Sequence, residues 1–116
     1  RNIKSYFLLD VEFPYLYNAS EKGEKNIAIR FSEKEPIENV SLFQNKVDWV
    51  WIDTITKLPI KKKNVEILKK FKTCLVCPSR WGRDLDISNY KKKINYLNYR
   101  IDFVMTETLF LKKWKY

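Results

Sequence analysis

Hydrophobic residues gather in five short segments along the chain, separated by longer stretches in which polar and charged positions dominate. The segments cover residues 6–10, 26–31, 47–53, 73–77 and 101–106, and they begin at intervals of 20 to 28 residues. Most of them are apolar at consecutive positions, which is typical of strands in a parallel sheet with helices over both faces. The pattern therefore predicts five buried parallel strands.

The stretches between the strands carry the spacing of amphipathic helices. Apolar positions recur three and four residues apart in residues 13–22, 35–43, 60–70, 86–97 and 109–116. Pro36 suits the first turn of the second helix, with Ser32 as its candidate N-cap and Glu35 three residues later. Asp86 or Ser88 is the candidate cap of the fourth helix. The chain thus repeats a strand followed by a helix.

This repeat predicts an α/β fold with a parallel sheet. Two architectures accommodate five such units. One is the C-terminal half of a TIM (β/α)8 barrel, whose usual length of ~250 residues would leave the other half upstream. The alternative is a doubly wound sheet of the flavodoxin or receiver kind. No linker divides the chain, so we expect residues 1–116 to be a single α/β unit, and we favour a fragment of a larger barrel.

The composition removes several classes of chemistry. The chain of 116 residues contains no histidine, which excludes Ser-His and Cys-His catalytic pairs and histidine-containing metal sites within it. Its two glycines, Gly23 and Gly82, lie 59 residues apart, which excludes a P-loop and a dinucleotide-binding fingerprint. Any catalysis by this chain alone would therefore depend on carboxylates, hydroxyls or arginines.

The net charge of +9 comes mainly from 18 lysines, with only 5 arginines. The AT-rich codons of a low-GC genome explain this excess without a partner, and base-reading surfaces usually depend on arginine. Lysine runs at residues 61–63, 69–70, 91–93 and 112–113 fall in predicted helices. We interpret them as solvated helix faces, and the alternative is that they contact a partner such as nucleic acid or an anionic membrane surface.

The two cysteines and the hydropathy indicate the compartment. Cys74 and Cys77 lie three residues apart on a predicted strand, where side chains point to opposite faces, too far apart for a disulfide. We therefore expect two buried thiols in a reducing compartment. No apolar run approaches the ~20 residues of a membrane helix, and residues 1–10 do not resemble a signal peptide. A cytoplasmic location is the expectation.

Acidic residues follow several predicted strands, and the carboxyl ends of parallel strands form the working edge in both architectures. The candidate metal ligands are Asp10, Glu12, Glu33 and Asp53. Carboxylate oxygens bind Mg²⁺ or Ca²⁺ without any histidine. The sequence therefore predicts a site for Mg²⁺ or Ca²⁺ at this edge, the alternative being that these acids only cap the following helices.

Basic residues and a hydroxyl occupy the same edge. Arg30 ends the second predicted strand, and Ser79, Arg80 and Arg83 surround Gly82 after the fourth. Two guanidinium groups, a hydroxyl and a flexible glycine suit the recognition of phosphate or carboxylate. The expected partner is a small anionic ligand that carries phosphate, and the alternative is a solvated loop.

The receiver alternative makes its own demands on these positions. Asp53 stands where that family has its phosphoacceptor, with Asp10 and Glu12 after the first strand and Ser79 after the fourth. Glu107 stands where the family has lysine after the fifth strand. A stand-alone signalling domain with Asp53 as phosphoacceptor is therefore the second hypothesis.

Several segments together resemble a known superfamily. They read FLLD at residues 7–10, IRFSE at 29–33, VDWVWID at 47–53, CLVCPS at 74–79 and IDFVMTE at 101–107. The combination resembles the C-terminal part of a phospholipase-C-like phosphodiesterase, a superfamily that includes glycerophosphodiester phosphodiesterases and phosphatidylinositol-specific phospholipases C. The resemblance covers nearly the whole chain, but its motifs are loose.

The resemblance implies a (β/α) barrel that cleaves phosphodiesters with two histidines and a divalent cation held by acids. Those histidines, with a His-Arg-Gly opening and a Glu-x-Asp metal motif, belong to the first strands, and this chain has none of them. What carries over is the rim of the pocket, namely Asp10, Arg30, Glu33, Asp53, Arg83 and Thr106. The chain alone is expected to be inactive, its partner being the N-terminal half of its own barrel. A non-catalytic relative that only binds an anion is the third hypothesis.

Overall fold

The structure is a computed structural model, and it describes residues 28–114. The predicted strand at residues 6–10 and the predicted helix at 13–22 lie outside the described residues. So do the candidate ligands Asp10 and Glu12 and the last two residues of the predicted C-terminal helix.

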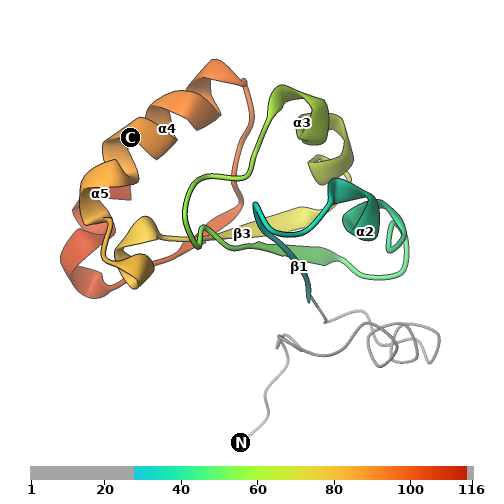
Figure 1. Cartoon of the computed structure of the whole chain (residues 1–116), viewed down its shortest axis with the longest axis horizontal. Helices are drawn as coiled ribbons and strands as arrows, with labels where there is room; N and C mark the ends of the chain where they lie inside the picture. The colour runs from blue at the N-terminus through green and yellow to red at the C-terminus, as the bar shows by residue number, and fades with distance from the viewer. Residues whose placement is uncertain (1–27, 115–116) are drawn as a thin grey trace, which may run out of the picture.

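Within residues 28–114, four parallel strands form one sheet in the order β1-β2-β3-β4 (Figure 1). They are β1 Ala28–Phe31, β2 Trp49–Ile52, β3 Lys72–Val76 and β4 Phe103–Met105. Each coincides with a predicted apolar segment, so the α/β class and the parallel pairing are confirmed. Strands adjacent in the sheet are also adjacent in the sequence, and Arg30, Trp51, Cys74 and Phe103 lie at one level across all four.

The strands are connected by short helices. The α-helices are α2 Ile37–Ser41, α3 Lys62–Leu68, α4 Ile87–Tyr96 and α5 Leu111–Trp114. The 3₁₀ helices are η1 Pro78–Trp81, η2 Asp84–Asp86 and η3 Thr108–Phe110. Two predicted starts are corrected: Pro36 and Lys61 have extended backbone, with ψ angles of 146° and 161°, so α2 and α3 begin after them. Ser32 does not cap α2, because its hydroxyl accepts the N–H of Lys34 at 3.1 Å.

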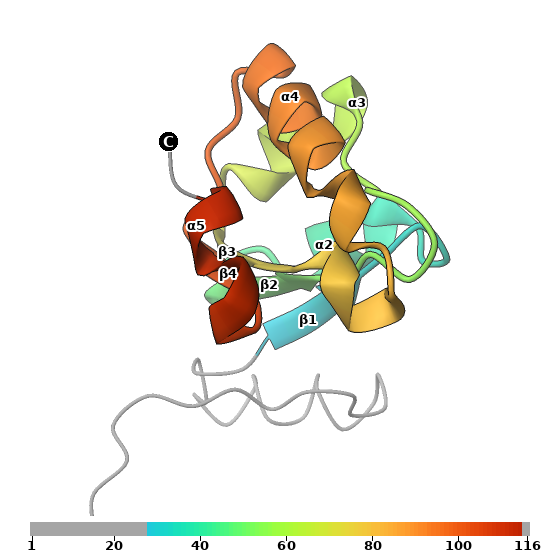
Figure 2. The ribbon, with the colours of Figure 1, turned by 90° about the vertical axis from the view of Figure 1, so that its left-hand side faces the viewer.

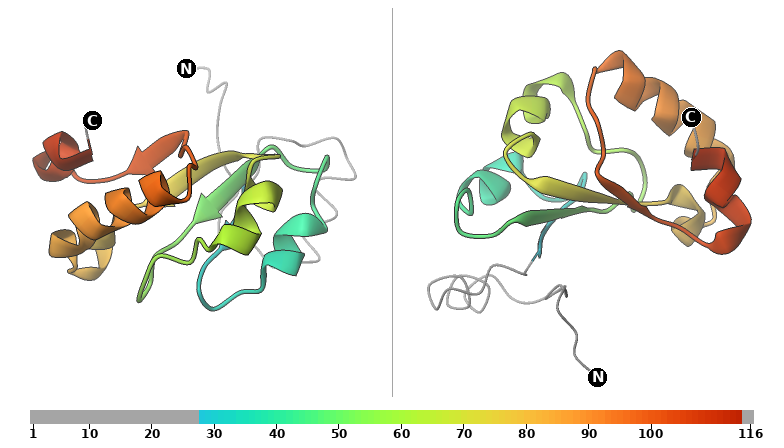
Figure 3. Two further views of the ribbon diagram at one scale, coloured as in Figure 1. Left: turned by 90° about the horizontal axis from the view of Figure 1, so that it is seen from above. Right: turned by 180° about the vertical axis from the view of Figure 1, so that it is seen from behind.

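Helices α2, α3 and α4 all lie over the same face of the sheet (Figures 1 and 2). This differs from the predicted cover of helices on both faces. Connections of one hand between strands that follow each other in one direction keep their helices on one side. The views from above and behind show the same layering, with η1 and α5 at one end of the molecule (Figure 3). None of the described helices is long and apolar enough to cross a membrane.

The core lies between these helices and the sheet. Alternation along the strands sends Ile29, Val50 and Leu75 toward the helices, where they are buried. The helices contribute Val40, Val65, Leu68, Tyr90 and Ile94 to the same cluster. Burial of these side chains is the main favourable contribution to folding, and it fixes which face of the sheet the helices cover.

The opposite face of the sheet also carries large apolar side chains. Trp49 and Phe103 lie on it with ring centroids 5.4 Å apart, and Met105 follows on β4. Phe103 is 59% exposed and Met105 37%. Cys74 lies on the same face, and burial raises the pKa of its thiol to about 11. Cys74 and Cys77 are free and buried, as predicted.

Candidate functional site

The loops that follow the carboxyl ends of the strands bring most of the described candidate residues to one edge of the sheet. Glu33 follows β1, Asp53 follows β2, and Ser79, Arg80 and Arg83 follow β3. Arg30 lies within β1 instead, where its guanidinium forms an ion pair of 2.8 Å with Glu35. Arg30 therefore belongs to a different part of the molecule from the other three predicted anion-binding residues.

Asp53 is buried at the end of the central strand β2. Its Oδ1 accepts two hydrogen bonds, from the backbone N–H of Thr54 at 2.8 Å and from Nε1 of Trp81 at 3.0 Å. The Thr54 hydroxyl in turn donates to the carbonyl of Val76 at 3.0 Å, which ties the β2 end to β3. The carboxylate is thus held in one orientation at the edge where the parallel strands end.

Arg83 joins the loops after β2 and β3 to α4. Its Nη1 donates to Asp86 at 2.9 Å and to the Tyr90 hydroxyl at 2.6 Å, and its Nη2 donates to the Thr54 carbonyl. Burial opposes the charge, but the hydrogen bonds that Arg83 donates to Tyr90 and Asp86 outweigh it and raise the pKa of Arg83. Through these contacts Arg83 connects the loops after β2 and β3 to α4, and we call this set of hydrogen bonds the clasp. Sequence reasoning missed this role.

Ser79 and Glu107 connect the loops after β3 and β4. The Ser79 hydroxyl donates to the Glu107 carboxylate, and its oxygen lies 3.1 Å from the Cys77 sulfur. This hydrogen bond, helped by a backbone N–H and by the charge of Arg80, lowers the pKa of Glu107. The Arg80 guanidinium lies 5.6 Å from the ring centre of Trp81. Ser79 and Arg80 therefore both lie near Glu107, the acid that stands where the receiver family has lysine.

Glu33 organises the loop after β2. Its Oε2 accepts the backbone N–H and the hydroxyl of Thr56 and, at 3.0 Å, the N–H of Lys57. Burial raises the pKa of Glu33, but the hydrogen bonds from Thr56 and Lys57 lower it by more than burial raises it. The pKa of Glu33 is therefore lowered. Glu33 is therefore an ionised acceptor that joins the first two loops.

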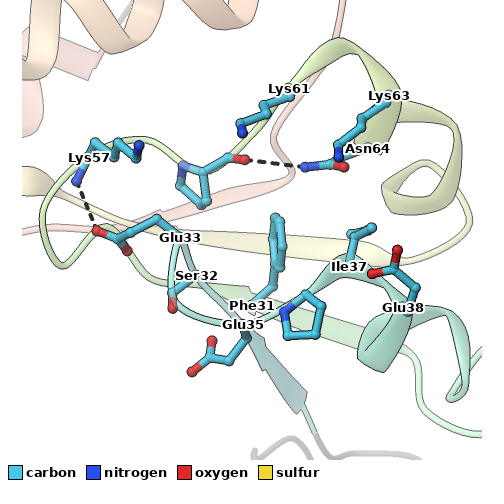
Figure 4. A pocket seen from close by; sticks show the side chains of 12 residues that line it. Phe31, Ser32, Glu33, Glu35, Ile37, Glu38, Lys57, Lys61, Lys63 and Asn64 are labelled. Carbon is cyan, nitrogen blue, oxygen red and sulfur yellow. Dashed lines mark hydrogen bonds between the residues drawn. The ribbon is translucent and has the colours of Figure 1, made fainter.

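A pocket of about 240 Å³ lies between the β1–α2 and β2–α3 loops (Figure 4). Phe31 and Ile37 form apolar parts of its wall, and it is lined further by Ser32, Glu33, Glu35, Pro36, Glu38, Lys57, Pro59, Lys61, Lys63 and Asn64. The Asn64 side chain donates to the Pro59 carbonyl at 3.3 Å. Buried oxygens of Glu33, Glu35 and Asn64 have no hydrogen-bond partner within the described structure. The pocket thus offers acceptors and three lysines to a small polar ligand.

Sequence reasoning missed this pocket, because Lys61 and Lys63 belong to a run that we interpreted as a solvated helix face. The available signal was Pro59, two residues before that run, because proline disfavours helical backbone in the residue before it. Lys61 itself has extended backbone, so the lysines begin at the N-terminal end of α3 and not in mid-helix.

The predicted Mg²⁺ or Ca²⁺ site stays a prediction. Residues 28–114 contain no group of three or more acids and cysteines placed to hold a metal ion. Two of the four candidate ligands, Asp10 and Glu12, lie outside that range. The other two, Glu33 and Asp53, already accept hydrogen bonds from the protein through one oxygen each.

Comparisons with known proteins find no match to this chain among family models, curated proteins or solved structures.

Proposed function

We propose that this chain is the C-terminal half of a TIM (β/α)8 barrel of the phosphodiester hydrolase type, and that its carboxyl edge binds a phosphate-bearing ligand. The order of the sheet carries the proposal. Strands follow β1-β2-β3-β4 without reversal, and α2, α3 and α4 cover one face. In a barrel every strand pairs with its sequence neighbour and every helix lies outside.

The same order argues against the doubly wound alternative. Flavodoxin-like and receiver sheets place their first strand between the second and the third, so that the chain reverses direction within the sheet. Among the described strands each consecutive pair is hydrogen-bonded. Glu107, hydrogen-bonded to Ser79, also occupies the position where a receiver requires lysine.

The face of the sheet away from the helices suits the interior of a barrel. Trp49 and Trp51 lie at alternate positions on β2, and Phe103 and Met105 do so on β4. Barrel interiors are filled by layers of large side chains from successive strands. The exposed fractions of Phe103 and Met105 are what a half barrel would have before its missing strands cover them.

Residues at the carboxyl edge favour the binding of an anionic ligand. Lys57, Lys61 and Lys63 line its pocket together with three glutamates, and Arg80 lies against the Trp81 ring, whose N–H donates to Asp53. In this proposal the catalytic histidines come from the upstream half. Glu33 and Asp53 would share Mg²⁺ or Ca²⁺ with acids of the earlier strands, and the cation would polarise a phosphoryl oxygen. The chain alone would then be inactive.

The test is hydrolysis by the complete natural reading frame that contains this chain. We expect upstream residues for about half a barrel, with histidines, and hydrolysis of a glycerophosphodiester that requires Mg²⁺ or Ca²⁺. Asp53→Asn should abolish turnover. Asp48→Asn is the matched control, because Asp48 is exposed at the amino end of the same strand.

Three other outcomes would overturn the hydrolase proposal. An upstream half barrel without histidines that binds phosphate but cleaves nothing would indicate a binding protein. A reading frame that starts directly before Arg1 would remove the half barrel. Acyl-phosphate formation on Asp53 from a small phosphodonor would establish the receiver alternative.

A further inference from the structure

The pocket between the β1–α2 and β2–α3 loops has two walls of opposite charge. Residues 31–38 contribute three glutamates to its lining and no basic side chain, whereas residues 57–64 contribute three lysines and no acid. We call them the acidic wall (Glu33, Glu35 and Glu38) and the basic wall (Lys57, Lys61 and Lys63). In Figure 4 the acidic wall lies below the pocket and the basic wall above it. The two kinds of charge are therefore separated across the pocket.

The two walls do not neutralise each other. Within residues 28–114, no ion pair joins a glutamate of the acidic wall to a lysine of the basic wall. Glu35 pairs instead with Arg30 at 2.8 Å, and Arg30 does not line the pocket. Glu33 and Glu38 thus carry the negative charge that no basic side chain compensates, opposite three lysines that no acid compensates.

Polar atoms at the pocket lack hydrogen-bond donors. Asn64 lines the pocket although it is only 3% exposed, and its Nδ2 donates to the Pro59 carbonyl while its Oδ1 has no partner. Glu33 and Glu35 each accept hydrogen bonds through one oxygen, and the other oxygen is buried without a partner. Buried acceptors without donors are unfavourable. A phosphate or carboxylate brings acceptors only, whereas an ammonium group brings three donors.

The size and the apolar lining limit the ligand further. The pocket volume of about 240 Å³ lies below the ~300–1,000 Å³ of pockets for drug-sized ligands. The buried side chains of Phe31 and Ile37, with Pro36 and Pro59, form apolar lining between the charged groups. This arrangement suits a ligand of a few heavy atoms, with a short carbon chain between two polar ends.

We propose that this pocket binds a small zwitterion, whose ammonium group faces the acidic wall and whose phosphate or carboxylate group faces the basic wall. A purely anionic ligand would meet the charges of Glu33 and Glu38, and a purely cationic ligand would meet three lysines. The inference rests on the proposed function for the phosphate, and it adds a positive group to that ligand.

The test is titration calorimetry on the protein from the complete reading frame, with four small probes. Phosphoethanolamine and β-alanine carry both charges, inorganic phosphate carries only the negative charge, and ethanolamine only the positive one. Phosphoethanolamine should bind roughly tenfold more tightly than inorganic phosphate or ethanolamine, the difference that one charge-assisted hydrogen bond makes. Comparison with β-alanine shows whether the acidic group is a phosphate or a carboxylate.

Variants of the two walls should separate the two charges of the ligand. Glu38→Gln should weaken the binding of phosphoethanolamine roughly threefold, because Glu38 is an exposed charge, and it should not weaken that of inorganic phosphate. Lys61→Gln with Lys63→Gln should weaken the binding of both probes. The exposure of these three side chains favours folded variants, which circular dichroism establishes.

Matched controls come from the C-terminal half of α3. Glu66→Gln removes an exposed acid there, and Lys69→Gln with Lys70→Gln removes two exposed lysines. These residues do not line the pocket, so the variants should bind phosphoethanolamine as the unchanged protein does. Equal losses in the control and the wall variants would reduce the effect to net charge and overturn the inference.

The remaining outcomes separate this inference from the proposed function. Inorganic phosphate that binds as tightly as phosphoethanolamine would overturn the zwitterion and leave the proposed function in place. Binding of β-alanine without binding of phosphoethanolamine would support the zwitterion and overturn the phosphate-bearing ligand. If neither zwitterion binds, the inference is wrong, whereas hydrolysis of a glycerophosphodiester by the same protein would still establish the proposed function.

Discussion

The two edges of the sheet are built differently. At the amino edge, polar groups satisfy one another around Thr73. Its N–H donates to Asp102 at 2.8 Å, and its hydroxyl oxygen accepts a hydrogen bond from Tyr99 at 3.2 Å. At the carboxyl edge, Glu33 and Asn64 keep buried oxygens without partners, beside lysines that line a pocket. At the amino edge the polar groups bond to one another, while at the carboxyl edge some polar groups are left to bind a ligand. In parallel α/β proteins the amino ends of the strands usually serve stability and the carboxyl ends serve function.

The largest expected difference between the two edges is a loss of folding stability at alkaline pH, which comes from the amino edge. Burial, with the nearby charge of Asp102, raises the pKa of Tyr99 from 10.0 to about 12, although the hydrogen bond with Thr73 lowers it. A raised pKa gives stability that is present below pH 10 and is lost as the pH rises toward 12, when the unfolded chain ionises first. The loss should be ~2 kcal/mol by pH 12.

Urea unfolding between pH 9 and 12 measures this loss, and Tyr99→Phe isolates it. The variant loses one hydrogen bond at neutral pH, which costs ~1 kcal/mol, but it should lack the additional alkaline loss. Tyr96→Phe is the control, because Tyr96 is 89% exposed. An alkaline loss of the same size in Tyr99→Phe would assign it to other groups.

A smaller effect is expected from the clasp at the carboxyl edge. Lysine in place of Arg83 cannot reproduce the planar fork that reaches Asp86, Tyr90 and the Thr54 carbonyl together. Arg83→Lys should lower the free energy of unfolding by ~1 kcal/mol, measured by urea titration at pH 7. Arg100→Lys, at an exposed position, should change nothing measurable. Equal stability of the two variants would refute the clasp.

The smallest expected effect is a loss of folding stability at acidic pH, which depends on Glu107 at the carboxyl edge. Because the pKa of Glu107 is lowered from 4.5, its ionised form gives stability at neutral pH, and that stability is lost as the pH falls below 4.5. Glu107→Gln should therefore flatten the acid limb of stability between pH 5 and 3. Thermal unfolding across that interval measures it, with the exposed Glu66→Gln as control. An unchanged acid limb would mean that the bond to Ser79 contributes nothing.

The strands were the most predictable part of the fold, because burial in a parallel sheet leaves continuous apolar runs such as residues 49–52. Helix starts were less predictable, since the extended backbone of Lys61 reflects the buried segment before it more than its own preference. The 3₁₀ turn η1 was missed as well. It spans Pro78–Trp81 and is followed by Gly82, whose φ of 76° is the left-handed conformation that glycine adopts freely.

The candidate site could be predicted only as a set of positions. That Asp53 ends a strand follows from the pattern, and so does its place at the carboxyl edge. The partners do not follow, because the hydrogen bond from Trp81 joins residues 28 positions apart and depends on the path of η1. For the same reason the sequence did not show that Arg83 donates to Asp86, Tyr90 and the Thr54 carbonyl, which belong to three different segments. The sequence predicts which residues lie at the carboxyl edge, but only the folded structure shows which groups they contact.

The order of the sheet has a consequence for how the chain is made. Each strand pairs with the strand that precedes it in the sequence, so every new strand–helix unit finds its neighbour already synthesised when it leaves the ribosome. Within residues 28–114, β2, β3 and β4 each find a partner encoded directly before them, and the contacts between neighbouring strands span only one unit at a time. Such an assembly can grow from the N-terminus during translation, and it leaves one growing edge exposed at any moment.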